Sequence, residues 1–385
     1  MSSNIGQGDY QKLQESADDA LRQKILVLGW RKAGKTSCIK PVFQQAPTSE
    51  ISRFGMTQKV EQINYDSIIP LQIWDTPSNF EIDQLEVPLS HFSTIVYVLD
   101  MQQDDSYHQS IGKFVHIMVR AYLSNPNMHF HLFIHKAEML HDDYRLENYA
   151  EIQRSTVEEI EDFRYSDLQD LSPGYDFSDP TTVSMIVNSL ISEVVYSMTS
   201  AYDVSLRTAW SKVLQGSMEM LSAVEALLLD YSSHSSTDNT FLFDINSRIV
   251  LATDNRHRTD ELTEQVTEYL TSFLQFQKLY KAISSKSPES SSGDKDLPDP
   301  DGEVVDEDED DEGDRGWWDD EDPDAPWMTQ STRLLPNTTL AMWQFNPYLV
   351  LVVLLRTDTW QARRGTIEYN LTFLRQGVRE ILSVV

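Results

Sequence analysis

The sequence has one cysteine and no long apolar run. Cys38 by itself excludes an internal disulfide or a structural zinc site, and it fits a reducing compartment. The longest apolar stretch, Tyr348–Leu355, is far shorter than the ~20 residues that a membrane helix needs. The first ten residues contain no basic and then apolar signal sequence. These features predict a soluble cytoplasmic protein that reaches a membrane only through its partners.

Basic residues are also scarce. The chain has 31 Lys and Arg against 61 Asp and Glu, a net charge of −30, which argues against DNA or RNA as a partner. Residues 284–328 alone hold 19 acidic and three basic residues. Hydrophobic residues make up 40% of the chain, which is enough to bury real cores. We therefore expect a folded protein that carries one disordered acidic insertion over 284–330.

Short apolar runs recur through the first half of the chain, and helix-length segments separate them. This pattern predicts βα units around a mainly parallel sheet. A polar alternating stretch at 57–65 predicts an antiparallel edge strand next to one of them. The apolar runs lie at 25–29, 69–75, 94–100, 130–136 and 193–200.

The second half alternates strands and helices in another order. A strand pair is expected at 239–254, an amphipathic helix at 259–280, two strands at 338–356 and a last helix after them. This order predicts an α+β module. The expected organisation is a flexible tail over 1–22, an α/β domain over 23–213 with a loop insertion at about 160–186, and an α+β domain over 214–385.

Residues 29–36 read GWRKAGKT and fit the pattern G-x-x-x-x-G-K-[ST]. Glycines let the backbone wrap so that its N–H groups face phosphate oxygens, and the following helix adds its positive dipole end. The alternative is a basic turn with two glycines by chance, but the strand before and the helix after favour a P-loop. The predicted phosphate contacts are Arg31, Lys32, Ala33, Gly34, Lys35, Thr36 and Ser37.

A P-loop needs an acidic residue to organise a metal ion. Asp75 ends an apolar strand 39 residues after Thr36, where a carboxylate can hold Mg²⁺ through water. A strand-end Asp can also be a solvated helix cap. Its place after the P-loop and one hairpin favours the metal role, with the Thr36 hydroxyl as a second ligand.

The order of P-loop, hairpin, WDTPSN, HKAE and TSAYD, followed by a small α+β domain, resembles the Rag family of small GTPases, and within it the Rag C/D type. The resemblance implies a Ras-like G domain followed by a roadblock-type domain, GTP or GDP with Mg²⁺ as cofactors, and obligate pairing with a Rag A/B-type GTPase. It also implies a role in reporting amino-acid supply to TOR complex 1 at the lysosome or vacuole surface. A scaffold complex at that membrane and a GTPase-activating protein would be further partners.

The resemblance also assigns roles to residues in the switch segments. Thr57 matches the switch I threonine that senses Mg²⁺ and the γ-phosphate, so it joins the metal ligands and the catalytic residues. Ser78 replaces a glycine whose amide touches the γ-phosphate. Asn79 replaces the glutamine that orients the attacking water, and it is one methylene shorter, so slow GTP hydrolysis is expected.

Two further segments match the part of the family pattern that reads the base. His135, Lys136 and Glu138 stand in a motif that usually ends in Asp, and a carboxylate there accepts both guanine N1–H and N2–H. Ser200 and Ala201 match the loop whose backbone N–H meets guanine O6.

Two other functions stay open from the residues. The departures at Ser78, Asn79 and Glu138 also fit a nucleotide-independent dimeric scaffold with a degenerate P-loop pocket. A P-loop ATPase or kinase is disfavoured because no second substrate site or catalytic base is visible.

Overall fold

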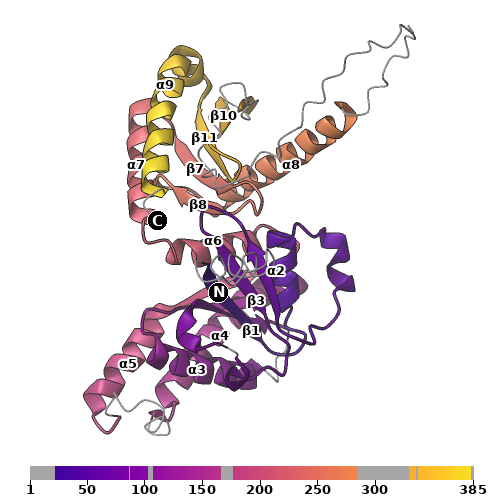
Figure 1. The fold of residues 1–385 in the computed structure, drawn as a ribbon, viewed down its shortest axis with the longest axis vertical. Coiled ribbons are helices and arrows are strands. Elements are labelled where there is room, and N and C mark those ends of the chain that lie inside the picture. Colours follow the sequence, from indigo (N-terminus) through magenta and orange to yellow (C-terminus); the bar gives the residue numbers. More distant parts are fainter. Residues whose placement is uncertain are drawn as a thin grey trace, which may run out of the picture.

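The computed structural model describes residues 22–85, 87–102, 107–165, 177–284, 329–334 and 337–382. The predicted N-terminal tail and most of the predicted acidic insertion lie outside these ranges. Figure 1 shows two domains, one above the other, with helix α6 (Ser205–Gly216) where they meet. Of the helices in the described ranges, each is either too short or too polar to traverse a lipid bilayer.

The N-terminal domain is built on a six-stranded sheet in the order β2-β3-β1-β4-β5-β6. Only the β2–β3 pair is antiparallel, and the other neighbours are parallel. The predicted mainly parallel sheet and its antiparallel edge strand are thereby confirmed. The strands are β1 (Gln23–Gly29), β2 (Glu61–Tyr65), β3 (Leu71–Asp75), β4 (Phe92–Asp100), β5 (His129–His135) and β6 (Val194–Thr199).

Helices cover both faces of this sheet. Ile25 and Val27 of β1 pack into one hydrophobic cluster, while Leu26 and Leu28 pack into another, because successive side chains of a strand point to opposite faces. The first cluster includes residues of α2 (Lys35–Phe43) and α6. The second includes residues of α3 (Tyr107–Ser124), α4 (Asp142–Asp162) and α5 (Pro180–Glu193).

The C-terminal domain is an antiparallel sheet with helices on both faces. Its strand order is β8-β7-β11-β10-β9, and its α+β class agrees with the sequence pattern. The strands are β7 (Asn239–Asp244), β8 (Val250–Thr253), β9 (Thr329–Leu334), β10 (Thr338–Gln344) and β11 (Leu349–Arg356). Helices α7 (Leu221–Ser235) and α9 (Thr357–Leu382) cover one face, and α8 (Asp260–Ser284) covers the other.

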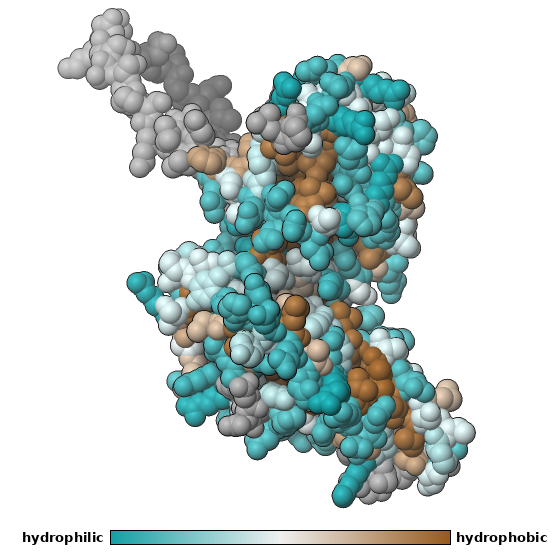
Figure 2. Space-filling model, turned by 180° about the vertical axis from the view of Figure 1, so that it is seen from behind, coloured by the Kyte–Doolittle hydropathy of each residue, from teal (hydrophilic) through white to brown (hydrophobic). Residues whose placement is uncertain are grey.

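Hydrophobic residues also reach the surface. Figure 2 shows them gathered in a band on each domain. In the C-terminal domain, Tyr369 and Phe373 on α9 are 63% and 58% exposed, and their rings contact each other edge to face at 5.0 Å. In the N-terminal domain, Met185 on α5 is 71% exposed.

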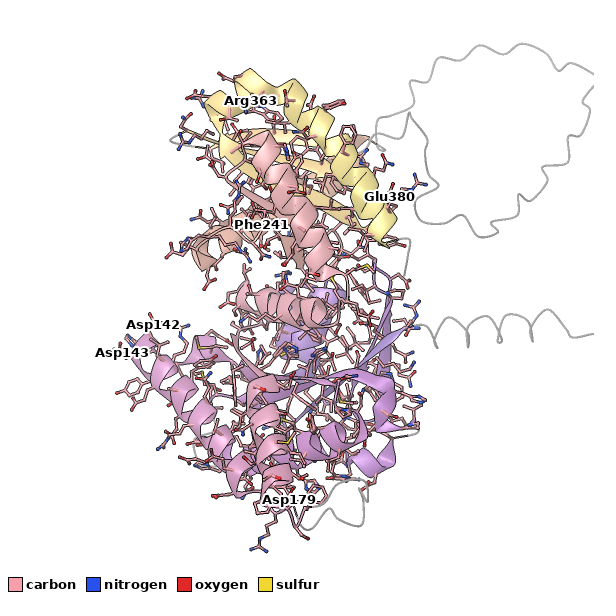
Figure 3. The ribbon with its side chains drawn as sticks, turned by 90° about the vertical axis from the view of Figure 1, so that its left-hand side faces the viewer. Asp142, Asp143, Asp179, Phe241, Arg363 and Glu380 are labelled. Carbon is pink, nitrogen blue, oxygen red and sulfur yellow. The ribbon has the colours of Figure 1, made fainter. Side chains whose placement is uncertain are left out.

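The predicted loop over about 160–186 is wrong in its second part. Helix α5 begins at Pro180, and Figure 3 shows Asp179 just before it, at the end of the domain farthest from the second domain. The Asp179 carboxylate accepts hydrogen bonds from the Thr181 N–H at 3.1 Å and the Thr182 hydroxyl at 3.0 Å. An Asp cap before Pro at the first helical position is a helix start, which the Ser, Asp, Gly and Pro content of the segment had hidden.

One further difference concerns the second half of the chain. Strand β9 was not predicted, because its sequence TQSTRL is polar and lies at a sheet edge, where one apolar face is not required. Its first two residues fall within the insertion that was expected to be disordered.

A continuous core joins the two domains. One hydrophobic cluster includes residues of both sheets and of α2, α6, α7 and α9. At its centre the buried Trp210 indole packs edge to face on Phe43 at 4.8 Å and on Phe133 at 5.5 Å, and its N–H donates to the Cys38 carbonyl at 2.8 Å. These contacts fix α6 against α2 and against the sheet.

Asp244 at the end of β7 is the polar link across the same junction. Its side chain is fully buried and accepts hydrogen bonds from the Tyr65 and Ser67 hydroxyls of the β2–β3 hairpin, the latter at 2.6 Å. Within its own turn it accepts from the Ser247 N–H at 2.7 Å and hydroxyl at 2.6 Å. A buried carboxylate is tolerated when donors surround it in this way.

Asp244→Ala should therefore lower the free energy of unfolding by roughly 2–4 kcal/mol, because it leaves buried hydroxyls without an acceptor. Urea denaturation monitored by tryptophan fluorescence measures this. Asp238→Ala, an exposed position in the same domain, is the matched control and should change stability by less than ~0.5 kcal/mol. Equal stability of the two variants would contradict this role.

Candidate functional site

The P-loop segment joins the end of β1 to the start of α2. Gly29 has φ 153°, and a Cβ there would lie 2.3 Å from the Val98 carbonyl oxygen. Gly34 has φ 99°, and a Cβ there would lie 2.6 Å from the His135 ring. Both positions therefore need glycine, for conformation and for space. The two glycines let the loop turn tightly so that α2 begins at Lys35.

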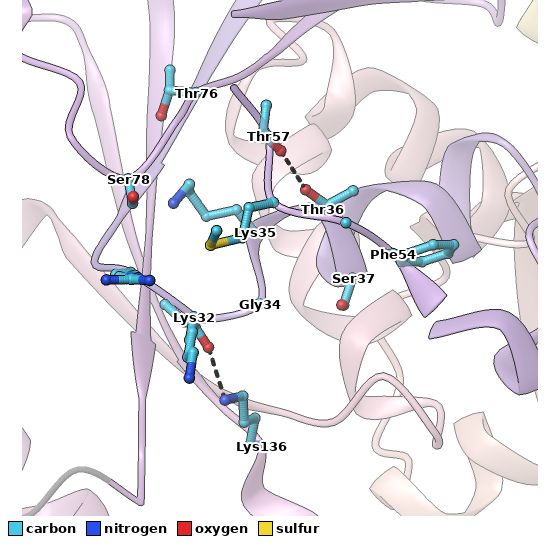
Figure 4. Close-up of a pocket in the computed structure, with 14 residues that line it drawn as sticks. Lys32, Gly34, Lys35, Thr36, Ser37, Phe54, Thr57, Thr76, Ser78 and Lys136 are labelled. Atoms are coloured by element: carbon cyan, nitrogen blue, oxygen red, sulfur yellow. Dashed lines mark hydrogen bonds between the residues drawn. The ribbon is translucent and has the colours of Figure 1, made fainter. Parts of the chain in front are cut away.

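A cavity of about 220 Å³ lies at the N-terminus of α2 (Figure 4). The first turn of α2 has no acidic residue, so the positive end of the helix dipole faces the cavity without internal compensation. Ten predicted residues line it: Arg31, Lys32, Ala33, Gly34, Lys35, Thr36, Ser37, Thr57, Ser78 and Lys136. The sequence had not indicated the other four, which are Phe54, Gly55, Met56 and Thr76.

Lys35 is the most buried of the four cationic residues that line the cavity. Its side chain folds back over the loop, and the ammonium donates to the carbonyls of Gly29 at 3.0 Å and Trp30 at 3.4 Å. Burial lowers its pKa, because the charged form loses water. An anion in the cavity would restore a counter-charge to this ammonium.

Three side-chain oxygens that can bind a metal ion meet beside the cavity. The Thr36 hydroxyl donates to Asp75 Oδ2 at 2.6 Å, the Thr57 hydroxyl donates to the same oxygen at 3.1 Å, and the two hydroxyls lie 3.0 Å apart. Figure 4 shows Thr36 and Thr57 pointing toward each other. The structure thus brings together the three predicted metal ligands from α2, the segment before β2, and the end of β3.

The carboxylate of Asp75 fits a hard divalent cation. It is fully buried, its Oδ1 has no hydrogen-bond partner, and burial raises its pKa. Carboxylate and hydroxyl oxygens are the ligands that Mg²⁺ accepts, and a cation here would compensate the buried negative charge. Among the residues described, no carboxylate other than Asp75 takes part in this cluster.

Asn79 lies outside the 220 Å³ cavity, in an open cleft next to it. Thr57 and Ser78 line both spaces, so they mark the boundary between them. Glu81 and Lys113 also line this cleft, and the Lys113 ammonium donates to the Glu81 carboxylate at 3.1 Å. Asn79 is exposed and is thereby placed beside Thr57 and Ser78, where solvent has access.

The predicted base-reading residues lie at the ends of β5 and β6. These strands are neighbours, and His135 pairs with Thr199, with 3.0 Å between His135 Nδ1 and the Thr199 hydroxyl. Burial lowers the pKa of His135 to about 4, so the imidazole is neutral at physiological pH. Glu138 is exposed, and Ser200 and Ala201 follow directly after β6. Of the predicted base-reading residues, Lys136 lines the 220 Å³ cavity, whereas His135, Glu138, Ser200 and Ala201 do not.

Lys136 connects the P-loop cavity with the segment that follows β5. Its backbone is left-handed, with φ 64°, and its ammonium donates to the Lys32 carbonyl at 2.8 Å and to Asp100 Oδ2 at 2.6 Å. Sequence reasoning missed Asp100. It ends β4 as Asp75 ends β3, and that repeated strand-end Asp was a signal that could have found it. Asp100 thus holds Lys136 over the P-loop.

Asp75→Asn tests the metal cluster. The raised pKa means that the ionised carboxylate destabilises the metal-free fold, so the free energy of unfolding of the wild type should rise as pH falls through the folded-state pKa. Without Mg²⁺ at neutral pH, Asp75→Asn should be at least as stable as the wild type. With Mg²⁺ and nucleotide it should gain less stability than the wild type.

Thermal unfolding with and without Mg²⁺ between about pH 4 and 8 measures both effects. The exposed substitution Asp238→Asn is the control. An Asp75→Asn protein that is markedly less stable without metal would mean that the carboxylate has a structural role.

Comparisons with known proteins agree with this architecture. Residues 24–274 match the family model described as the Gtr1/RagA G protein conserved region. The GTP-binding protein gtr2 of Schizosaccharomyces pombe is 24% identical over 94% of this chain and 98% of its own. The human Ras-related GTP-binding protein C is 26% identical over 95% of this chain and 78% of its own. The GTP-binding protein gtr1 of S. pombe is 19% identical over 67% of this chain and 79% of its own.

Proposed function

Because this chain belongs to the Gtr1/RagA family of G proteins, we propose that it is a guanine-nucleotide-binding regulatory GTPase and the Rag C/D-type subunit of a Rag heterodimer. The observation that carries the proposal is the convergence of Thr36, Thr57 and Asp75 beside the P-loop cavity. A hydroxyl from the P-loop helix, one from the segment before β2 and a strand-end carboxylate together form the kind of oxygen set that a hard divalent cation needs. A basic turn would not require this arrangement.

The cavity would hold the phosphates of GTP or GDP. Residues Arg31 to Ser37, among them the buried Lys35, line it at the N-terminus of α2, where the free N–H groups of a first helical turn attract an anion. Thr36, Thr57 and Asp75 would hold Mg²⁺, which would neutralise charge on the phosphate oxygens. Ser78 would contribute to the γ-phosphate side, since it lines both the cavity and the open cleft.

Guanine would lie between the segments that follow β5 and β6. The exposed Glu138 carboxylate would accept the N1–H and N2–H of guanine, which adenine does not offer in that arrangement. The backbone at Ser200 and Ala201 would donate to guanine O6. The stem of Lys136 is held in place by Asp100 and Lys32, and it would support the base from the P-loop side.

Hydrolysis would be slow and would depend on an activating protein. Asn79 is exposed at the edge of the open cleft, and its amide is one methylene closer to the backbone than that of glutamine. Thr57 would help to order the γ-phosphate side. Unassisted small GTPases turn over at about 10⁻⁴ s⁻¹, and a poorly placed amide would keep the rate at or below that level.

The C-terminal domain would pair with a Rag A/B-type GTPase. The relatives named gtr2 and protein C support this assignment, and so do the exposed Tyr369 and Phe373 on α9. In this setting the heterodimer would be held at the lysosome or vacuole surface by a scaffold complex, and would report amino-acid supply to TOR complex 1. This chain would reach the membrane through those partners.

The first test is the nucleotide content of the purified protein, released by heat in the presence of Mg²⁺ and resolved by chromatography. Wild type should carry guanine nucleotide near one per chain, and Lys35→Ala should lose most of it, because the phosphates lose their buried cation. Lys40→Ala is the matched control, since Lys40 lies on the same helix and faces Glu61 at 3.5 Å. A wild type that GTP and GDP cannot fill would favour the nucleotide-independent scaffold.

Asn79→Gln should raise single-turnover GTP hydrolysis several-fold at saturating GTP. The longer side chain would bring its amide nearer to the attacking water, which is the role of glutamine in related GTPases. Asn127→Gln, in an exposed turn, is the control and should hydrolyse GTP as the wild type does. An unchanged rate in Asn79→Gln would remove Asn79 from the catalytic residues.

A further inference from the structure

A second cavity lies where the two domains meet. Its volume is about 170 Å³, and it is bounded by α6, by the β7–β8 hairpin and by the first turns of α8. It shares no lining residue with the P-loop cavity. A single water needs only ~10–15 Å³ of such space, so a polyatomic ion can be accommodated.

Four cations from both domains line this space, which we call the basic cavity. They are Arg207 and Lys212 on α6, Arg248 in the β7–β8 turn, and Arg258 before α8. Asp260 is the one carboxylate among its described lining residues. None of the four cations forms an ion pair with a carboxylate in the part of the chain that the structure describes. The basic cavity therefore carries a local excess of three positive charges in a chain with a net charge of −30.

The two most enclosed cations repel each other. Arg207 and Arg248 are half-buried, and burial together with the charge of Arg248 lowers the pKa of Arg207 to about 10. Arg207 Nε–H donates to the Ser247 carbonyl at 3.2 Å, whereas Arg248 Nε is buried without a hydrogen-bond partner. The fold thus holds two guanidinium groups together without an internal counter-charge.

The free donors of the basic cavity are charged groups. Its hydroxyls are already engaged, since Ser211 donates to the Val250 carbonyl at 2.7 Å and Thr267 to the Thr263 carbonyl at 2.8 Å. The guanidinium groups of Arg248 and Arg258 have no such partner among the described residues. Helix α8 begins at Asp260, and the acidic side chains of Asp260 and Glu261 in its first turn offset its positive dipole end.

We propose that the basic cavity binds a phosphate group, carried by a soluble phosphomonoester or by a phosphorylated lipid headgroup. Guanidinium forks match the oxygen spacing of phosphate, and a doubly charged anion balances the local excess better than a carboxylate does. Since Arg207 and Lys212 belong to one domain and Arg248 and Arg258 to the other, the bound phosphate bridges the two domains. This assignment does not depend on the proposed nucleotide function.

Thermal unfolding and calorimetric titration of the full chain with inorganic phosphate test the site, with sodium chloride at matched ionic strength as reference. About 10 mM phosphate should raise the Tm of the wild type by several degrees. Arg248→Gln and Arg258→Gln should reduce that shift at least about threefold, because each removes one of the free cations. Arg364→Gln, an exposed arginine paired with Glu368, should keep the full shift.

Two further comparisons distinguish the basic cavity from the P-loop and from a loss of stability. Lys35→Ala should keep the shift, since the P-loop is a different site. Without phosphate, Arg248→Gln should melt no lower than Arg364→Gln, because it relieves repulsion. A shift that is unchanged in Arg248→Gln, or lost only in Lys35→Ala, would overturn the proposal.

The source of the phosphate is resolved by comparing soluble inositol phosphate with phosphatidylcholine vesicles that contain a phosphoinositide. Binding to either probe that is lost in Arg258→Gln supports the site and identifies its source. Failure of both probes and of inorganic phosphate would overturn it, and so would binding that is confined to a phosphorylated peptide.

Discussion

The buried carboxylate of Asp75 is the constraint on which the site is built. It ends β3, a strand buried along its whole length, and it draws the hydroxyls of Thr36 and Thr57 toward one oxygen while its other oxygen stays unpaired. A buried charge of this kind is stable only if a cation or several donors compensate it. These hydrogen bonds hold the start of α2, the segment before β2 and the end of β3 together beside the cavity.

The β2–β3 hairpin extends this constraint to the second domain. At one end of the hairpin β3 carries Asp75, and at the other end Tyr65 and Ser67 donate to the buried Asp244. Around this polar link, the Trp210 ring closes the apolar part of the junction against Phe43 and Phe133. The β2–β3 hairpin and the C-terminal domain are therefore packed directly against each other.

Positive charge is concentrated in two cavities of this protein, although the chain as a whole is strongly acidic. The P-loop cavity is lined by Arg31, Lys32, Lys35 and Lys136, and no carboxylate lines it among the described residues. The basic cavity repeats this excess between the domains. In a strongly acidic chain, the surrounding field repels anions from most of the surface, so two local concentrations of positive charge mark the places where an anion can bind.

Features that depend on neighbouring residues could be predicted from the amino-acid sequence. The spacing of Gly29, Gly34 and Lys35 predicted a phosphate-binding turn, and the apolar runs predicted the parallel sheet. Both signals are local, because backbone conformation and strand burial select residue types at positions a few residues apart. The sequence was less informative where the pattern of a structural element was short and polar, as at β9 and at the Asp179 cap of α5. The folded chain was needed to show that Tyr65 contacts Asp244, that Asp100 holds Lys136, and that Arg207 lies beside Arg248. These pairs are far apart along the chain, and no local rule fixes a distance that depends on how strands pair and how domains pack.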